Sequence, residues 1–259
     1  MRSIVVVLLI VAASLSGCRK KPDPVAEPQL IDSGVVPTND GHLEIVFENM
    51  VGSQALQLNS GTYTNEAGNS FTVRMYKYYI SNIKLWRADS TFYIEPESYH
   101  LINEEISSSK TVLIHDVPKG AYTAITFMIG VDVDRNTSGA QTGALDPMNM
   151  MFWDWNTGYI MAKIEGTAVG VPGGLGFHIG GFEGKDGVLR WVTRQLPAAA
   201  NVTGAGTPEI HIKSDVLEWF KTPIIIDFNT HSFVGSAGEN AAKIADNYAD
   251  MFTVTHVEN

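Results

Sequence analysis

Short apolar segments separated by turn-forming residues fill the chain from about residue 42 onward, and this pattern restricts the fold more than any other feature. Several segments alternate apolar and polar residues, as residues 71–86 (FTVRMYKYYISNIKLW) and 111–117 (TVLIHDV) do. Many short strands with Gly, Pro, Asn and Asp between them predict an all-β fold, an antiparallel β-sandwich of the immunoglobulin-like kind. The other predicted strands are residues 43–47, 91–95, 121–131, 158–167, 176–182, 188–196, 209–214 and 223–227.

Two short helices are predicted to interrupt these strands. The first covers residues 215–220 (DVLEWF), with Ser214 as its N-cap and Asp215 near the positive end of the helix dipole. The second covers residues 239–250 (ENAAKIADNYAD) and should pack on the sandwich through one apolar face. That face consists of Ala241, Ile244, Ala245 and Tyr248.

One strand is predicted to be buried on both faces, near the centre of the sandwich. Tyr78 and Ile80 share one face of this strand, while Tyr79 and Ser81 share the other. Asn82 follows directly, and we expect its amide to join backbone groups at a strand bend.

The first 17 residues have the features of a secretory signal peptide. Arg2 supplies a positive charge, and the apolar run 4–13 is much shorter than the roughly 20 residues that span a bilayer. The tetrapeptide 15–18 (LSGC) resembles the lipobox cut by lipoprotein signal peptidase. Cys18 is the only cysteine in the chain and has no disulfide partner, so we expect it to carry the lipid that anchors the protein.

A linker separates this N-terminus from the folded domain. Residues 18–41 contain four prolines and little apolar periodicity, which suits a semi-rigid spacer. Residues 42–259 are then expected to form one domain. Arg19 follows the lipidated cysteine, where Asp would signal retention in the inner membrane, so we expect a cell-envelope protein anchored at the outer membrane.

Net charge and missing motifs argue against several function classes. The formal net charge of −10 argues against a nucleic-acid partner. The sequence lacks Gly-x-Ser-x-Gly, a phosphate-binding glycine loop and His-Glu-x-x-His, so we do not expect an enzyme. A glycosidase with paired acids such as Asp154 and Glu165 stays open, because their separation in space decides it. With Cys18 lipidated, any metal must use His, Met or oxygen ligands.

The most specific segment is residues 130–166, an irregular stretch rich in Trp, Met and Asp. Together with residues 78–86, 177–182 and 247–252, it resembles the MbnP-like family of copper-binding periplasmic proteins and lipoproteins. The resemblance implies a β-sandwich that holds copper, in some members with a tryptophan oxidised to kynurenine beside two histidine ligands. A di-haem peroxidase-like partner is implied to perform that oxidation. The matching residues, in family order, are Tyr78, Tyr79, Ser81, Asn82, Gly130, Val131, Asp132, 143–147 and 153–159.

Copper ligands are sought first among the histidines. His178 lies in Phe-His-Ile-Gly-Gly, which recurs in the family, and neutral imidazole is the commonest transition-metal ligand. His231 follows an Ile-rich segment at a loop mouth, and both histidines also have structural interpretations. None of the histidines follows a tryptophan at the Trp-x-His spacing of one related branch. The remaining histidines show no metal-ligand spacing and are expected to be structural or solvent-facing: His42, His100, His115, His211 and His256.

Methionines and tryptophans supply the other copper candidates. Met150 and Met151 offer soft thioether sulfurs suited to Cu(I), with packing under the long loop as the alternative. Trp153 and Trp155 are the candidates for oxidative modification. Because they are two residues apart, their side chains point to the same side of an extended backbone.

A calcium site is the second metal hypothesis. Asp132, Asp134 and Asn136 have the one-three-five spacing of a calcium loop, without the Gly and bidentate Glu of an EF-hand. Asx-type turns capped by the same side chains are the alternative interpretation.

Two functions follow from these patterns. The first is a lipid-anchored periplasmic protein that binds copper and is the substrate of a di-haem peroxidase-like partner. The alternative is a non-enzymatic adhesion or scaffold lipoprotein with a calcium-stabilised loop. In that alternative Trp153, Trp155 and Trp191 contact a glycan or a protein.

Overall fold

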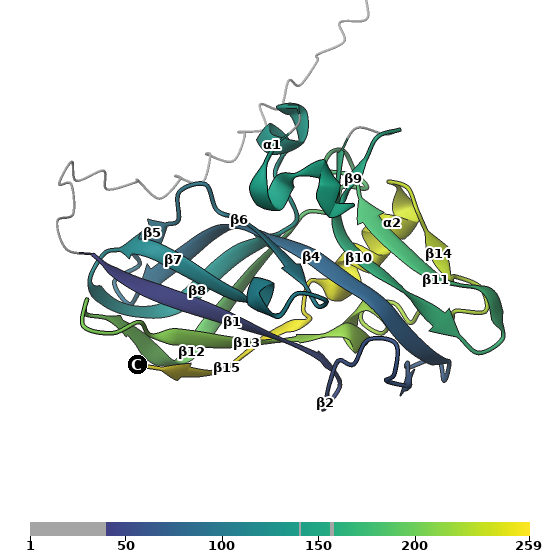
Figure 1. Cartoon of the computed structure of the whole chain (residues 1–259), viewed down its shortest axis with the longest axis horizontal. Helices are drawn as coiled ribbons and strands as arrows, with labels where there is room; N and C mark the ends of the chain where they lie inside the picture. Colours follow the sequence, from purple (N-terminus) through teal and green to yellow (C-terminus); the bar gives the residue numbers. More distant parts are fainter. Residues whose placement is uncertain (1–39, 140, 156–157) are drawn as a thin grey trace, which may run out of the picture. The chain divides into compact units, whose positions relative to one another are not determined.

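The computed structural model describes residues 40–139, 141–155 and 158–259, and these form two sheets of a β-sandwich (Figure 1). The predicted signal peptide, Cys18 and the linker up to residue 39 lie outside the described residues. The smaller sheet contains β1 (Gly41–Val51), β2 (Gln54–Ala55), β7 (Thr111–Val117), β13 (Glu209–Asp215) and β15 (Phe252–Glu258). Its order is β15-β13-β1-β2, and β7 also pairs with β1.

The larger sheet is built around one long strand, β4 (Ser70–Arg87). Its other strands are β3 (Tyr63–Thr64), β5 (Phe92–Ile94), β6 (Tyr99–Asn103), β8 (Gly120–Ile129), β9 (Phe152–Trp153), β10 (Gly158–Ala168), β11 (Val171–Gly180), β12 (Arg190–Val202) and β14 (Phe233–Val234). The order is β12-β8-β4-β10-β11-β14. The short strands β3, β5 and β6 pair with β4, and β9 pairs with β10.

Aromatic rings from both sheets meet in the core. Phe47 of β1 contacts Tyr78 of β4 at a ring-centroid distance of 6.1 Å and Phe127 of β8 at 6.4 Å. Phe252 of β15 lies 5.0 Å from Phe127, edge to face. All four side chains are buried. Large buried aromatic rings dominate core energetics, so these contacts join the two sheets through a continuous apolar layer.

The strand predicted to be buried on both faces is β4. Tyr78, Tyr79, Ile80 and Ser81 are all fully buried, as predicted. The strand bends at Asn82, whose φ of 54° lies in the left-handed region that Asn tolerates better than most residues.

The predicted bend at Asn82 is confirmed, but the expected role of its amide is wrong. The amide nitrogen donates to the Asp132 carboxylate at 2.8 Å instead of joining backbone groups. This hydrogen bond therefore links β4 to the start of the irregular segment, residues 130–166.

Short helices fill the connections. They are α1 (Val133–Thr137), α2 (Glu239–Tyr248) and the 3₁₀ helices η1 (Ser107–Lys110), η2 (Gly143–Leu145), η3 (Pro147–Asn149) and η4 (Val216–Phe220). The predicted helical segment 215–220 is thus a 3₁₀ turn, while α2 buries the predicted face of Ala241, Ile244, Ala245 and Tyr248. In the described part of the chain, no helix is long and apolar enough to cross a membrane.

The predicted N-cap at Ser214 is wrong. Ser214 is fully buried at the end of β13, where its hydroxyl lies 2.8 Å from the Tyr76 hydroxyl. Asp215 caps η4 instead, because its Oδ1 accepts hydrogen bonds from the backbone N–H of Leu217 and of Gly52. The acidic side chain thus acts as the cap itself.

The predicted strand at residues 223–227 is also wrong. Several of its backbone groups bond to side chains: the N–H of Ile224 donates to the Asn247 amide oxygen, the Asn247 amide nitrogen donates to the C=O of Ile224, and the Asn65 amide donates to the C=O of Ile226. The N–H of Ile226 donates to the backbone carbonyl of Phe220. These bonds replace a strand ladder.

The sheets are mixed and not purely antiparallel, since β1 pairs with β13 and β11 pairs with β14 in parallel. Turn residues in the sequence indicate the pairing only of strands that follow one another. The two parallel pairs join strands that are distant in the sequence, so turn residues do not reveal them.

Candidate metal centre

Four of the predicted site residues line one pocket beside β10 and β11. The pocket has a volume of about 370 Å³, and its wall includes His178, Met150, Trp153 and Trp155. These residues come from β11, from the turn after η3, and from β9 with the residues that follow it. The rest of the lining is Pro147, Phe152, Asp154, Ile160, Lys163, Phe233 and Gly235.

Local backbone geometry places the methionine and the first tryptophan. The carboxylate of Asp146 caps η3 by accepting from the N–H of Met148, and the chain then turns at Met150, whose φ is 60°. Trp153 packs over Gly180, where an added Cβ would lie 2.5 Å from its ring. The missing side chain at Gly180 therefore makes room for the indole.

His178 is held by Glu165 from the neighbouring strand. Its Nε2 lies 2.9 Å from Oε1 of Glu165, whose Oε2 also accepts from Arg74 at 2.9 Å. Burial alone would raise the pKa of Glu165, but the hydrogen bond from Arg74 and the charge of Lys163 lower it to about 2. Because an ionised carboxylate only accepts, Nε2 of His178 must carry the proton.

This arrangement leaves Nδ1 of His178 as the atom that can bind a metal. Burial and the nearby Lys163 charge lower the pKa of His178, so the imidazole is neutral at pH 7. Within the described residues Nδ1 forms no hydrogen bond and is not among the buried unpaired atoms, so solvent reaches it. Metal-binding histidines commonly donate their other N–H to a carboxylate in this way.

Two lysines lie under the loop that forms the pocket wall. In the sheet register, Lys163 of β10 lies opposite His178 of β11 on one side and opposite Lys77 of β4 on the other. Lys163 Nζ lies 3.4 Å from the Met150 carbonyl, and Lys77 Nζ lies 3.5 Å from the Asn149 carbonyl. The ammonium groups hold the loop in place and add positive charge near the pocket.

The donor set fits a soft, singly charged metal ion. One neutral imidazole and the thioether of Met150, 67% exposed, line the pocket together with two indoles whose centroids are 5.4 Å apart. Soft thioether ligands select Cu(I), while the charge of Lys163 is offset by its ion pair with Glu165 at 3.4 Å and by Asp154 in the pocket wall, so the thioether is the feature that favours Cu(I). The wall contains one histidine, so a site with two histidine ligands does not fit these residues.

Comparison with known proteins decides the family. The MbnP family model matches residues 40–239. The chain belongs to the MbnP family. MbnP from Methylosinus trichosporium has a similar fold, with a TM-score of 0.50 and 12% sequence identity over 73% of this chain and 80% of that chain. A search of curated proteins found no match. Membership of the MbnP family supports a metal-binding role.

Two predicted copper ligands lie elsewhere in this MbnP-family chain. Met151 is fully buried in the hydrophobic core, next to Met150 in sequence but outside the pocket wall. His231 is exposed on the turn after Asp227, and its Nδ1 lies 2.9 Å from the Thr230 hydroxyl. The structure therefore brings together His178 and Met150 only.

The structure gives the calcium hypothesis no support. Asp132 caps α1 through the N–H of Arg135, and its other oxygen accepts from Asn82 and Tyr99. Asn136 is buried and donates its amide to backbone carbonyls of the same turn. The alternative interpretation of these side chains as caps is the one observed, with Asp134 in the first turn of α1.

Glu165 does not suit the general-acid role in a glycosidase. A general acid needs a raised pKa, whereas the pKa of Glu165 is lowered to about 2 because Arg74 and Lys163 stabilise its ionised form.

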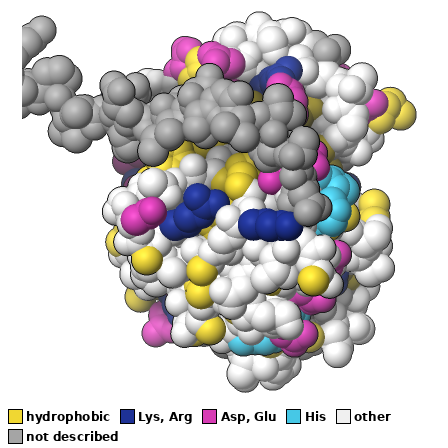
Figure 2. All heavy atoms as spheres, turned by 90° about the vertical axis from the view of Figure 1, so that its left-hand side faces the viewer, with side chains coloured by type: hydrophobic (Ala, Val, Ile, Leu, Met, Phe, Trp, Pro, Cys, Tyr) yellow, Lys and Arg dark blue, Asp and Glu magenta, His cyan; other side chains and the backbone are white. Residues whose placement is uncertain are grey.

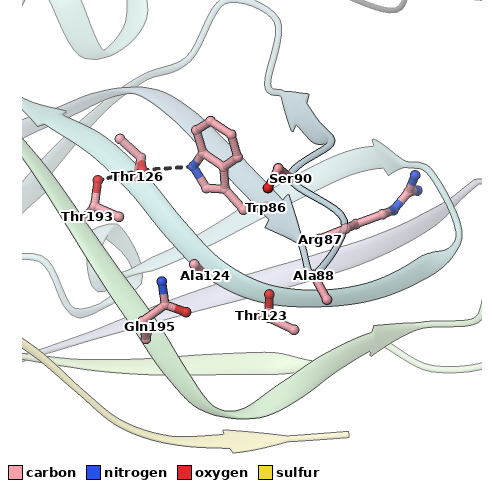
Figure 3. Close-up of a pocket in the computed structure, with 9 residues that line it drawn as sticks. All are labelled: Trp86, Arg87, Ala88, Ser90, Thr123, Ala124, Thr126, Thr193 and Gln195. Atoms are coloured by element: carbon pink, nitrogen blue, oxygen red, sulfur yellow. Dashed lines mark hydrogen bonds between the residues drawn. The ribbon is translucent and has the colours of Figure 1, made fainter. Parts of the chain in front are cut away.

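A second pocket, of about 360 Å³, lies over β4, β8 and β12 (Figure 3). Trp86 donates its Nε1–H to the Thr126 hydroxyl at 2.9 Å, which lies 2.8 Å from the Thr193 hydroxyl. Arg87 supplies the only charge in the lining, which contains no imidazole, thioether or carboxylate ligand for a transition metal.

Sequence reasoning missed the surroundings of His178. Lys163 lies directly opposite His178 in the sheet register, and Glu165, considered in the sequence only as a glycosidase acid, lies two residues further along the same strand. His211 and His256, expected to be structural or solvent-facing, are cross-strand neighbours whose rings stack at 4.0 Å. Spacing along the sequence does not reveal this pair, because strand pairing joins positions that are distant in the sequence.

Proposed function

We propose that this protein binds copper as Cu(I) at the pocket formed by His178 and Met150. The observation that carries the proposal is the hydrogen bond from Nε2 of His178 to Glu165, which leaves a neutral Nδ1 accessible to solvent in the same pocket as a thioether. Copper at this place would supply a redox-active centre beside two indoles. The residues themselves bind and orient the ion.

We further propose that Trp155 is the residue that a di-haem peroxidase-like partner oxidises. Its side chain is 66% exposed, whereas Trp153 is 6% exposed beneath it. An external haem protein can approach the exposed indole directly. Mass spectrometry of the peptide containing residues 152–159, purified from cells with and without a di-haem peroxidase, tests this part of the proposal.

The location in the cell envelope belongs to the same proposal. A lipid on Cys18 would tether the domain through the proline-containing linker. Replacing Cys18 with Ala should release a soluble periplasmic form, because acyl chains then no longer provide membrane affinity. Retention of the variant in the membrane fraction would contradict the lipid anchor.

The adhesion alternative has less support than copper binding. Of the three tryptophans named for an aromatic contact surface, Trp155 and Trp191 are exposed and Trp153 is buried, whereas copper binding is also supported by membership of the MbnP family. Elemental analysis of protein purified from the native envelope separates the two functions. Stoichiometric copper supports the proposal, and copper at background level refutes it.

A further inference from the structure

The outer face of the smaller sheet carries a row of three carboxylates in register. Glu44 of β1 pairs with Glu209 of β13, and Glu209 pairs with Glu258 of β15. The next row places His211 of β13 opposite His256 of β15. Three acids and two imidazoles therefore occupy neighbouring positions on three adjacent strands.

This row of carboxylates has no cation from the protein. In residues 40–139, 141–155 and 158–259, neither Lys nor Arg lies within ion-pair distance of Glu44, Glu209 or Glu258. Like charges directly opposite one another destabilise a sheet. A bound cation would remove this repulsion.

His211 is the most constrained member of the group. Its side chain is 14% exposed, and in the described part of the chain neither ring nitrogen has a hydrogen-bond partner. A buried polar atom without a partner destabilises the folded state, and native proteins rarely leave one without a reason. The ring stacks on His256 with a centroid distance of 4.0 Å and an interplanar angle of 15°.

The ligand atoms lie close to metal-binding distances, and the stacked rings of His211 and His256 must also rotate, because an imidazole nitrogen binds a metal in the plane of its ring. One ligand atom from each of His211, His256 and Glu258 lies within 4.8 Å of the other two. Two ligands on one zinc ion can be at most about 4 Å apart, since each bond is about 2.0–2.2 Å long. Glu258 and His256 are exposed and can move by this amount, while Nδ1 of His256 is held 3.0 Å from the Thr255 hydroxyl.

We propose that His211, His256 and Glu258 form a second metal site, for a divalent first-row ion such as Zn²⁺, separate from the His178 pocket. Glu209 lies 3.3 Å from Nε2 of His211 and can act as a fourth ligand. Two imidazoles with carboxylates are a zinc-type donor set. Figure 2 shows histidine side chains beside acidic ones on this end of the molecule.

Binding there would clamp the C-terminal strand to the sheet. His256 and Glu258 lie on β15, which follows the region matched by the family model, and β15 is the edge strand of its sheet. An ion shared with His211 connects β15 to β13 through side chains as well as backbone hydrogen bonds. The site is thus a structural metal clamp on an edge strand.

Calorimetric titration of the metal-free full chain with Zn²⁺ tests this proposal. Wild type should bind Zn²⁺, and His256→Ala should weaken binding by more than about 100-fold, beyond the roughly 10- to 100-fold typical of an outer-shell partner. Glu258→Gln should also weaken it. His115→Ala is the matched control, because His115 is exposed on β7 of the same sheet. This variant should bind Zn²⁺ with the affinity of wild type.

Hydrogen exchange of residues 252–258 gives an independent measurement. Zn²⁺ should slow exchange in wild type and in His178→Ala, and not in His256→Ala. Equal Zn²⁺ affinity in wild type and His256→Ala, or loss of Zn²⁺ binding in His178→Ala, would overturn the proposal. These results do not depend on copper binding at His178. Failure of the zinc proposal can therefore be distinguished from failure of the copper proposal.

Discussion

Nε2 of His178 lies 2.9 Å from Oε1 of Glu165, on adjacent antiparallel strands. The pair fixes which ring nitrogen carries the proton, because the ionised carboxylate can only accept. It also fixes the ring orientation in the pocket that contains Met150 and the two tryptophans. The copper affinity of this pocket should thus depend on Glu165 as well as on His178.

Replacing Glu165 with Leu should therefore weaken copper binding by about 10- to 100-fold, the usual effect of losing an outer-shell partner. Glu165→Gln should have a smaller effect, since an amide oxygen still accepts from Nε2–H. Competition with a chromophoric Cu(I) chelator at pH 7.5 measures both. Wild-type affinity in Glu165→Leu would show that the pair does not orient a ligand.

Copper affinity should persist to lower pH than for an ordinary histidine. Burial and the Lys163 charge lower the pKa of His178, so protonation competes with the metal only below pH 6.5. Lys163→Gln should raise the pKa of His178 and move the loss of affinity to higher pH. Titrations from pH 4.5 to 8 check this, and an unchanged midpoint in Lys163→Gln would contradict it.

Gly180→Ala should destabilise the pocket. The new Cβ would lie 2.5 Å from the Trp153 ring and 2.9 Å from the Tyr159 carbonyl oxygen, which is an overpacking change of about 1–3 kcal/mol in the free energy of unfolding. Chemical denaturation followed by tryptophan fluorescence measures this. Gly173→Ala on the same strand is the control, because no heavy atom lies within 4 Å of its added Cβ.

Asn82→Ala should lower the free energy of unfolding by about 1–3 kcal/mol, because it removes a hydrogen bond from the partly buried Asp132 carboxylate. Asn82→Gly separates the two contributions. Glycine accepts the φ of 54° but lacks the amide, so it should be less destabilising than alanine. Equal stability of wild type and both variants would show that neither the bend nor the hydrogen bond matters.

Local patterns were sufficient to predict most of the fold. Period-two alternation placed β4, β7 and β13, and the apolar face of α2 is the one predicted. The pattern failed at residues 223–227, where the backbone groups of Ile224 and Ile226 bond to the side chains of Asn247 and Asn65. A run of apolar residues alone does not reveal whether its backbone will hydrogen-bond to a neighbouring strand or to a side-chain amide.

The candidate site could be predicted only in part. His178 and Met150 carry their own chemistry and were recognised as single residues, whereas their neighbours Lys163 and Glu165 depend on strand register. The pairing of His211 with His256 depends on a sheet contact between segments 45 positions apart, as the register shows. Spacing rules for metal motifs apply within one segment and miss such pairs.

Titration of the metal-free full chain with Cu(I), against a competing chelator, tests the central claim most directly. Wild type should bind about one equivalent at the His178 pocket. His178→Ala should lose affinity by about 100-fold or more, since it removes a direct ligand. His231→Ala, outside the pocket, should bind as wild type does. Equal affinity of wild type and His178→Ala, or no binding by wild type, would contradict the assignment of this pocket as the copper site.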